Sequence, residues 1–122
     1  MRAATDVLPA RTTVDAAFKT THGGPSDAWP VTDDRGVAGV ISRAQIEQAM
    51  AKGETKKPLR DLLDGRDFPF VHADHPLYVA LERMGTAKLD LLPVVSRADI
   101  HYLIGVVVLA DVLNSYGVKN RH

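Results

Sequence analysis

The chain contains one internal repeat, and the second copy starts about half-way along its 122 residues. The segment Thr13–Ala17 aligns with Pro76–Ala80, and Trp29–Val31 aligns with Leu92–Val94, both at an offset of 63 residues. Because duplicated segments fold as duplicated units, this repeat constrains the architecture more than any other feature. Two copies are too few for a solenoid, so we expect a pair of pseudo-symmetric halves.

The second copy is three residues longer than the first. A third match, of Gly39–Ile41 with Gly105–Val107, has an offset of 66 residues, so the extra residues lie within 97–101. That segment falls in a loop between two predicted strands, where an insertion is well tolerated. We therefore expect the same fold in both copies, with a longer hairpin in the second.

Each copy reads as helix, strand, turn, strand and helix. For the first copy the pattern predicts a helix capped by Thr12 or Thr13, a strand over 29–32, a turn over 33–36, a strand over 37–41 and a helix from Ser42 to about 53. For the second it predicts a helix from Pro76 that stops at Gly85, a strand over 91–95, a turn near 98–99, a strand over 102–108 and a helix over 109–117.

These elements divide the chain into a first repeat over 1–52, a linker over 53–65 and a second repeat over 66–122. The linker contains a short predicted helix over 58–63. Pro30 and Pro93 lie inside predicted strands, and because proline lacks the ladder donor they indicate edge or bulged positions. Neither half is long enough to bury much apolar surface alone. We therefore expect an α+β fold in which the two repeats pack sheet to sheet around one shared core.

The composition limits the classes of function. Lys and Arg total 15, Asp and Glu also total 15, and no basic face for a nucleic-acid partner is expected. The absence of cysteine excludes disulfides, thiolate nucleophiles and cysteine-ligated metals. The longest apolar runs, such as Leu103–Ala110, are too short to span a bilayer, and Met1–Ala10 lacks the apolar region of a signal peptide. These features predict a cytoplasmic domain.

The order of a capped helix, a hydrophobic-Pro-Val strand, a hairpin and a Gly-led strand before a helix occurs twice. This order resembles a tandem cystathionine-β-synthase (CBS) domain pair, or Bateman module. The resemblance is closer in the second copy, through Val71–Leu77, Leu91–Val95 and Gly105–Leu113. The stretch Asp111–Val118 is similar to the end of the cytosolic CBS pair of some bacterial chloride channels and transporters.

The resemblance implies two β-α-β-β-α units whose sheets pack about a pseudo-twofold axis and leave two clefts. In this family the clefts often hold adenosine derivatives such as AMP, ADP, ATP or S-adenosylmethionine. The family signature is Gly-h-h-Thr-x-x-Asp, where h is hydrophobic. Its hydroxyl and helix N-terminus face phosphate, and its carboxylate accepts hydrogen bonds from the ribose hydroxyls.

The chain keeps this signature in part. In the second copy the glycine and Asp111 are present, Val108 stands at the threonine position, and Ala110 stands where nucleotide binders often have a basic residue. In the first copy the glycine is present, Ser42 can replace threonine, and Gln45 stands in place of aspartate. Each departure predicts weaker nucleotide binding.

The resemblance also implies which residues form the two clefts. Each cleft combines the signature of one repeat with the first strand and the hydrophobic-Pro-Val segment of the other. The better cleft is expected to contain Asp111 and Val108 with Leu8, Pro9, Ala28, Trp29 and Pro30, and the poorer one Ser42 and Gln45 with Val71, His72, Leu91 and Leu92.

Several of these residues also have a structural explanation. The Ser42–Gln45 segment has the spacing of a capping box, and we favour that role over ligand binding. Asp111 in the first turn of a helix offsets the macrodipole, an explanation that weighs equally with ribose binding. Trp29 is expected in the core rather than stacked on adenine. His72 and His75 lack the further ligands of a metal site, so no metal is predicted.

We therefore interpret the chain as a regulatory module of a larger protein that senses AMP, ADP or ATP and needs no cofactor. The resemblance suggests a chloride channel or transporter as the parent. The alternative is a non-binding module that dimerises its parent. We expect a homodimer, because the predicted helix after Pro76 has an apolar face of Leu77, Ala80, Leu81 and Met84. No nucleophile, base and orienting group occur together, so enzymatic activity is not expected.

Overall fold

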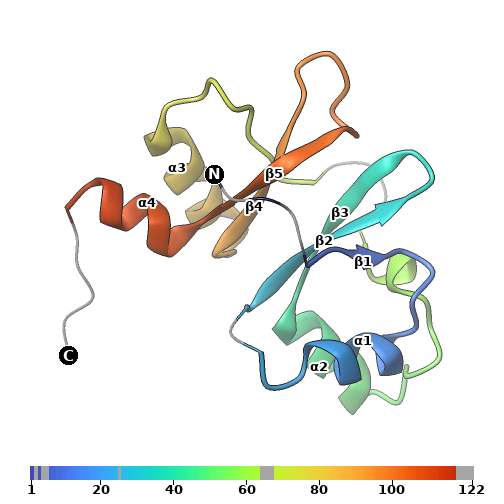
Figure 1. The fold of residues 1–122 in the computed structure, drawn as a ribbon. Coiled ribbons are helices and arrows are strands. Elements are labelled where there is room, and N and C mark those ends of the chain that lie inside the picture. The colour runs from blue at the N-terminus through green and yellow to red at the C-terminus, as the bar shows by residue number, and fades with distance from the viewer. Residues whose placement is uncertain (2, 4–5, 25, 64–67, 118–122) are drawn as a thin grey trace.

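The structure is a computed structural model that describes residues 1, 3, 6–24, 26–63 and 68–117. The two repeats lie at opposite ends of the molecule, and their strands meet in the middle (Figure 1). The first repeat contains β1 (Leu8–Pro9), α1 (Val14–Thr21), β2 (Ala28–Asp33), β3 (Gly36–Ser42) and α2 (Arg43–Ala51). A 3₁₀ helix, η1 (Leu59–Leu62), follows; the second repeat contains α3 (Leu77–Ala87), β4 (Leu91–Val95), β5 (Leu103–Val108) and α4 (Leu109–Ser115).

The predicted order of helices and strands is confirmed in both repeats, but three helix ends differ by about two residues: α2 and α4 end earlier than predicted, at Ala51 and Ser115, and α3 ends later. Thr13 caps α1 by accepting a hydrogen bond at Oγ1 from the Ala16 N–H, at 3.2 Å. Helix α3, however, does not stop at Gly85. It continues to Ala87 and is capped by Lys88, whose left-handed backbone has φ 58°. One glycine costs a helix only about 1 kcal/mol relative to alanine, which tertiary packing readily offsets.

The duplication extends to the hydrogen-bond register of the sheets. In the first repeat β1 pairs in parallel with β2, and β2 pairs antiparallel with β3; in the second, β4 pairs antiparallel with β5. The register of each hairpin shifts at the equivalent place, directly after Val31 in β2 and directly after Val94 in β4. The equivalent pairs are Leu8 with Val31 and Val71 with Val94 across the parallel contacts, and Val31 with Gly39 and Val94 with Gly105 across the hairpins.

The two strand prolines lie where their sequence context predicts. Strand β2 is the middle strand of its sheet, but β1 pairs only with Val31 and Thr32 of that strand. Pro30 therefore has a paired strand on one side only, and the register shift follows directly after Val31. Pro93 has the equivalent place in β4, one residue before Val94 and its register shift. Both prolines thus avoid the loss of a ladder hydrogen bond.

The expected single core is instead divided into three clusters. Each repeat has a core of its own, because its helices cover its own sheet. The first includes Val14, Trp29, Ile41 and Ile46, and the second includes Ala80, Met84, Leu92 and Val112. A third and smaller cluster joins the repeats, and its buried members form two pairs related by the repeat: Ala28 with Leu91, and Val40 with Val106.

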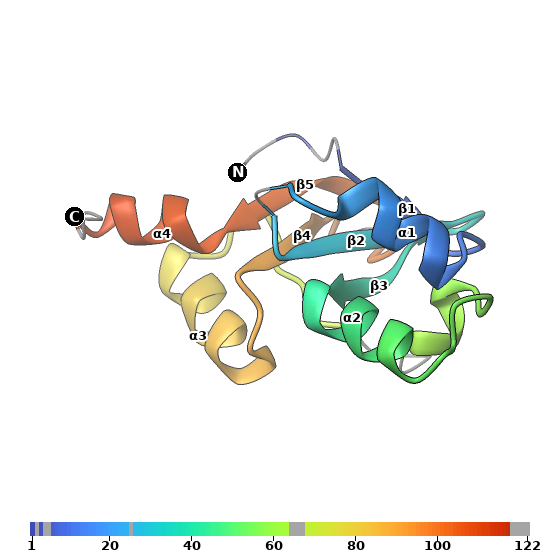
Figure 2. The same cartoon turned by 90° about the horizontal axis from the view of Figure 1, so that it is seen from below.

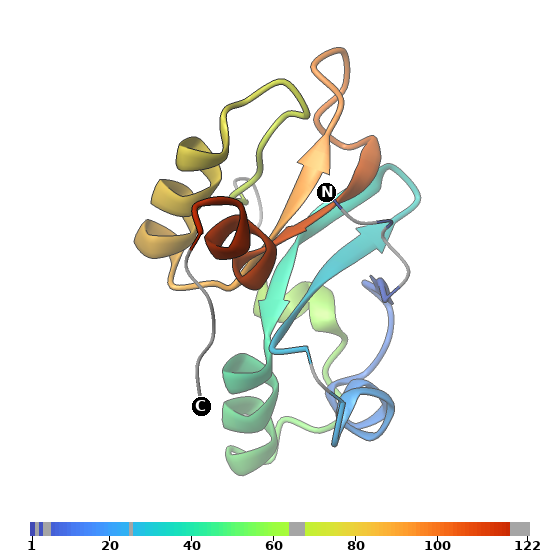
Figure 3. The same cartoon turned by 60° about the vertical axis from the view of Figure 1, so that its left-hand side comes forward.

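The three-residue insertion forms a second contact between the repeats. In the β4–β5 hairpin the His101 carbonyl oxygen accepts a hydrogen bond from the Val37 N–H at 2.8 Å, and His101 Nδ1 donates to the Val37 carbonyl oxygen at 2.9 Å. Gly36 allows this approach: its φ is 117°, and a Cβ there would lie 1.9 Å from the His101 carbonyl oxygen. Both hairpins point away from α1 and α2 (Figure 3).

The predicted linker helix is present as η1, and it packs with the first repeat. Leu59 is fully buried in the first-repeat core, and its N–H donates to the Thr12 carbonyl oxygen at 2.8 Å. The predicted boundary between residues 65 and 66 and the predicted end of the resemblance at Val118 lie outside the described residues. None of the described helices is both long and apolar enough to cross a membrane.

Candidate functional site

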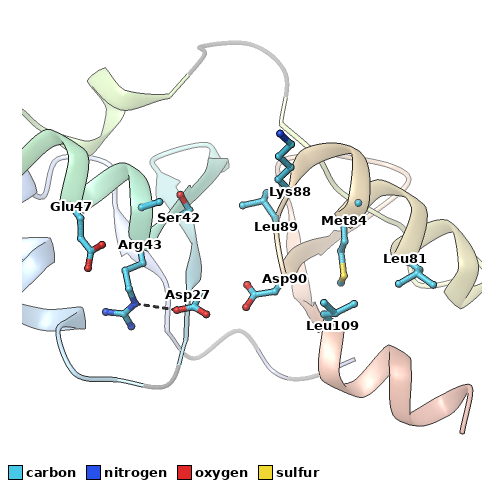
Figure 4. Close-up of a pocket in the computed structure, with 12 residues that line it drawn as sticks. Asp27, Ser42, Arg43, Glu47, Leu81, Met84, Lys88, Leu89, Asp90 and Leu109 are labelled. Carbon is cyan, nitrogen blue, oxygen red and sulfur yellow. Dashed lines mark hydrogen bonds and ion pairs between the residues drawn. The ribbon is translucent and has the colours of Figure 1, made fainter. Parts of the chain in front are cut away.

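A cavity of about 680 Å³ lies between the two repeats. Helices α2 and α3 lie on the same side of the strands (Figure 2), and the cavity separates them. We call it the inter-repeat cavity. The first repeat supplies mainly polar groups to its wall, and the second supplies mainly apolar ones (Figure 4). It is lined by Asp27, Ser42, Arg43, Ala44 and Glu47 from the first repeat and by Leu81, Met84, Gly85, Lys88, Leu89, Asp90 and Leu109 from the second.

Arg43, at the start of α2, has a structural role in the wall of this cavity. Its guanidinium lies over the Trp29 ring, 5.4 Å from the centroid, which is a cation–π geometry. The same group holds the segment between α1 and β2 in place. Arg43 donates from Nε to Asp27 Oδ1 at 3.1 Å, from Nη1 to the Thr21 carbonyl oxygen at 3.5 Å, and from Nη2 to the carbonyl oxygens of Gly24, at 2.9 Å, and Ser26.

Asp27 and Asp90 occupy equivalent positions of the two repeats and reach toward the cavity from opposite walls (Figure 4). Burial raises the pKa of Asp90, and the negative charge of Asp27 raises it further. The two carboxylates differ in one respect. Asp27 forms an ion pair with Arg43, but Leu109 stands at the position of the second repeat that is equivalent to Arg43.

Ser42 and Gln45 form the predicted capping box. The Gln45 N–H donates to Ser42 Oγ at 3.2 Å, and the Ser42 N–H donates to Gln45 Oε1 at 2.9 Å. Both side chains thus satisfy backbone groups at the start of α2. Gln45 in this arrangement has its carbonyl oxygen engaged by the helix, which confirms the structural interpretation of these two residues.

The residues of the predicted better cleft are brought together in two groups. Ala28 and Val108 lie against the same small cluster between the repeats. Leu8 and Trp29 line a second cavity, of about 370 Å³, in the first repeat. Trp29 is only 4% exposed and belongs to the first-repeat core, as its structural interpretation predicts.

The other members of that predicted cleft lie around these groups. Pro30 is buried in β2, and Pro9 is exposed at the end of β1. Asp111 is half-buried in the first turn of α4, and Val108 is the N-cap residue of that helix without a side-chain cap. Asp111 lines none of the three cavities described in this section.

The residues of the predicted poorer cleft are distributed over separate sites. Ser42 lines the inter-repeat cavity, whereas Val71 and His72 line a third cavity, of about 110 Å³, at the start of the second repeat. Leu92 is fully buried in the second-repeat core, and Leu91 belongs to the cluster between the repeats. In the part of the chain that the structure describes, no three metal-ligating side chains gather at one place.

Sequence reasoning missed the charged groups that face the inter-repeat cavity. Asp27 and Asp90 are related by the same offset of 63 residues that aligns the strands, so the repeat could have paired them. The many hydrogen bonds of Arg43 had no comparable signal. Most of its partners are backbone carbonyl oxygens at the end of α1 and in the loop that follows, and no side-chain pattern predicts where those oxygens lie.

The comparisons with known proteins agree with this architecture. The CBS domain family model matches residues 59–117, and no curated protein sequence matches the chain. Hypoxic Response Protein I, solved with two coordinated zinc ions, is 22% identical, with a TM-score of 0.76 over 93% of this chain and 92% of that chain. The CBS domain pair of protein MJ0100, in complex with 5′-methylthioadenosine and S-adenosyl-L-methionine, is 20% identical, with a TM-score of 0.72 over 93% and 89%.

A third similar structure is the cytosolic domain of the Mg²⁺ channel MgtE in complex with ATP. It is 19% identical, with a TM-score of 0.70, and the match covers 89% of this chain and 44% of that chain. At these identities the likeness shows a common fold. The family match identifies a CBS domain at residues 59–117, and the chain as a whole shares the two-repeat fold of a CBS domain pair, or Bateman module.

Proposed function

We propose that this CBS domain pair is a regulatory module that binds an adenosine-type ligand between its repeats. The observation that carries the proposal is the division of the core. Four buried residues (Ala28, Val40, Leu91 and Val106) and the His101 contact join the repeats, whereas each repeat has a larger core of its own. A ligand that contacts both repeats therefore favours one relative orientation in proportion to its differential affinity.

The proposed ligand is AMP, ADP or ATP, bound weakly near Val108 and Asp111. An ionised carboxylate such as that of Asp111 only accepts hydrogen bonds, which suits the two hydroxyls of a ribose. Val108 lies against Ala28 of the other repeat, but its side chain has no donor for a phosphate. In the first repeat the equivalent Gln45 is engaged in the capping box, so we propose a single site.

The test is a calorimetric titration of the protein with AMP, ADP and ATP. The wild type is expected to bind one nucleotide weakly, and Asp111→Ala is expected to abolish binding. Val108→Thr restores a hydroxyl for the phosphate. Because a hydrogen bond to a charged group contributes about 1.5–3 kcal/mol, that variant is expected to bind roughly tenfold more tightly or better. Asn114→Ala, at an exposed position of the same helix, is the matched control and should bind as the wild type does.

Two outcomes would contradict this assignment. If Asp111→Ala binds as well as the wild type, the carboxylate acts only at the helix end. If two sites of equal affinity appear, the Gln45 position also binds nucleotide. Absence of binding by all three nucleotides would instead favour a structural role.

The structural role is the second candidate, and the capping box favours it. Ser42, Gln45 and Arg43 all satisfy groups of the protein itself, so the first repeat's signature segment serves folding. In this role the module would dimerise a larger parent protein. Of the apolar face expected to mediate dimerisation, Ala80 and Met84 are buried within the second-repeat core, and Leu77 remains 40% exposed beside Tyr78, at 60%.

The dimer and the parent are both open to direct tests. Light scattering at high concentration is expected to give the mass of a homodimer, and Tyr78→Ser is expected to weaken it if α3 is the contact. A strict monomer would contradict the dimer. For the parent, we propose a membrane transport protein that holds this module at its cytoplasmic side. A reading frame that joins the module to a long apolar domain would support that proposal, and fusion to a different effector would contradict it.

A further inference from the structure

Three histidines of the second repeat form hydrogen bonds through Nδ1, and the bonds are of two kinds. His72 Nδ1 contacts the Val95 carbonyl oxygen and His101 Nδ1 contacts the Val37 carbonyl oxygen, both at 2.9 Å. A carbonyl oxygen only accepts, so both rings carry a proton on Nδ1. His75 differs: its Nδ1 lies 3.0 Å from the backbone N–H of His72. A backbone N–H only donates, so His75 Nδ1 is unprotonated and the neutral ring carries its proton on Nε2.

Protonation therefore affects these rings differently. When His72 or His101 becomes charged, the new proton binds Nε2 and the existing Nδ1–H bond is kept. When His75 becomes charged, the new proton binds Nδ1 and turns the acceptor into a donor that faces another donor. The bond to the His72 N–H is then lost. Within the 72–75 turn, the bond in which the His75 N–H donates to the His72 carbonyl oxygen at 3.0 Å is kept.

The surroundings of His75 also disfavour the charged ring. Arg83 of α3 and Arg97 of the β4–β5 hairpin face it with positive charge, as does His72 when protonated, and Asp74 opposes them. The Arg97 Nε–H is shared between both carboxylate oxygens of Asp74, at 2.9 and 3.0 Å. Partial burial lowers the pKa of His75 most, and the two arginines lower it further. The ring also stands just before the N-terminus of α3, where the helix dipole disfavours a cation.

The turn held by His75 forms much of the third cavity. This space of about 110 Å³ is lined by residues of the turn and its flanks together with residues from elsewhere in the chain: Val71, His72, Ala73, His75, Pro76 and Leu77, with Met1, Ala80, Val94 and Val107. A change in the turn therefore changes the cavity. We propose that the 72–75 turn is a proton-sensitive gate of this cavity, held in place by the His75 bond while the ring is neutral and released when His75 takes a proton on Nδ1. This device goes beyond nucleotide binding and does not depend on it.

The direction of the pH dependence follows from the lowered pKa of His75. The pKa of His75 is lower in the folded protein than its ordinary value of 6.5, so the folded state favours the neutral ring. The contribution of the hydrogen-bonded turn to stability is complete above the pKa of His75 in the unfolded state. It is lost as the pH falls from there through the folded-state pKa of His75. The gate thus opens under mildly acidic conditions.

Nitrogen-15 NMR of the intact chain tests the proposal directly. At neutral pH the ring nitrogens are expected to show a proton on Nε2 of His75 and on Nδ1 of His72 and His101. As the pH falls from about 8 to about 4.5, across the histidine range, the His72 amide resonance should lose its hydrogen-bonded shift. Its midpoint should equal that of the His75 ring and lie below 6.5.

Two variants separate the gate from general acid effects. His75→Asn supplies a side-chain oxygen that accepts from the His72 N–H and does not titrate, so the fold should be kept and the midpoint should vanish. His101→Asn, which retains a donor for the Val37 carbonyl oxygen, should leave the midpoint unchanged. The proposal is overturned if His75 carries its proton on Nδ1 at neutral pH, or if the His72 amide fails to follow the His75 ring. A midpoint that persists in His75→Asn would overturn it as well.

Discussion

The N-termini of α2 and α4 are equivalent in backbone and different in chemistry. The Arg43 N–H donates to the Asp27 carbonyl oxygen and the Leu109 N–H donates to the Asp90 carbonyl oxygen, both at 2.8 Å. The side chains at these equivalent positions differ. Helix α2 starts with a capping serine and an arginine, whereas α4 starts after Val108 without a side-chain cap and has Asp111 in its first turn.

This difference separates two tasks that the family signature combines. In the first repeat the signature segment stabilises its own helix and the loop before β2, which leaves its polar groups engaged. In the second repeat the same segment contributes little to capping and keeps the acidic residue that suits a ribose. In the proposed function, one copy of the duplicated backbone thus serves the fold and the other binds the nucleotide. Substitutions that exchange the two segments' residues test this separation.

Arg43→Leu, which gives the first repeat the residue of the second, should have the largest effect. The variant loses the bonds to the carbonyl oxygens of Thr21, Gly24 and Ser26 and the contact with Trp29. Hydrogen bonds to a charged group contribute about 1.5–3 kcal/mol each, and water replaces some of them here. We expect the free energy of unfolding to fall by about 2–3 kcal/mol in urea denaturation.

The control is Arg97→Leu in the β4–β5 hairpin. Arg97 also bonds to an aspartate, Asp74, but both side chains are more than half exposed. Exposed ion pairs contribute little to stability, so the loss should be much smaller. Equal losses in the two variants would show that Arg43 is an ordinary surface arginine and that the first repeat has no special anchor.

Ser42→Ala should have the next largest effect, because it removes the capping box of α2. Loss of a serine N-cap typically costs about 1 kcal/mol. The same denaturation experiment should show that loss, and nucleotide affinity should be unchanged. Reduced affinity in this variant would place a ligand at the first repeat and contradict the separation of tasks.

Val108→Thr makes the reciprocal change and should stabilise the protein by about 0.5 kcal/mol, less than a full cap contributes. The hydroxyl can accept from a backbone N–H at the start of α4, but the valine it replaces packs between the repeats. Thermal unfolding without nucleotide measures this effect apart from binding. A loss of stability would mean that packing of Val108 against the cluster outweighs capping.

The sequence is sufficient to predict the parts of the structure that depend on local signals. The repeat offsets predict equivalent registers, the Ser42–Gln45 spacing predicts the capping box, and prolines predict the register shifts. Contacts between distant segments cannot be predicted from such local signals. The insertion at 97–101 is visible as a length difference, but its hydrogen bonds to Val37 depend on how the two repeats are oriented.

The candidate site likewise has a part that local signals predict and a part that depends on the packing of the two repeats. The signature positions Val108 and Asp111 are found by alignment of the two copies, and both lie at the start of α4. Alignment does not find the two cavity walls, because Asp90 comes to face Asp27 and Arg43 only through the packing of one repeat on the other. Local spacing contains no information on that packing. The predicted helix end at Gly85 failed for a related reason, since burial of Ala80 and Met84 carries α3 past the glycine.

Asp90→Asn should have the smallest effect, and its sign is opposite to that of the same change at Asp27. Burial and the charge of Asp27 raise the pKa of Asp90, so the folded state binds this proton more readily than the unfolded state does. The ionised carboxylate therefore costs stability, and the cost develops as the pH rises from the ordinary value of 3.8 through the folded-state pKa. Removing the charge should stabilise the protein at pH 7, and the gain should vanish in acid.

Asp27→Asn should instead destabilise, because Asp27 accepts the Arg43 Nε–H bond at 3.1 Å. Urea denaturation of both variants and the wild type at neutral and acidic pH measures the two signs, since effects of other carboxylates cancel in each difference. If both variants destabilise at pH 7, Asp90 has a stabilising partner of its own, and the two cavity walls are electrostatically alike.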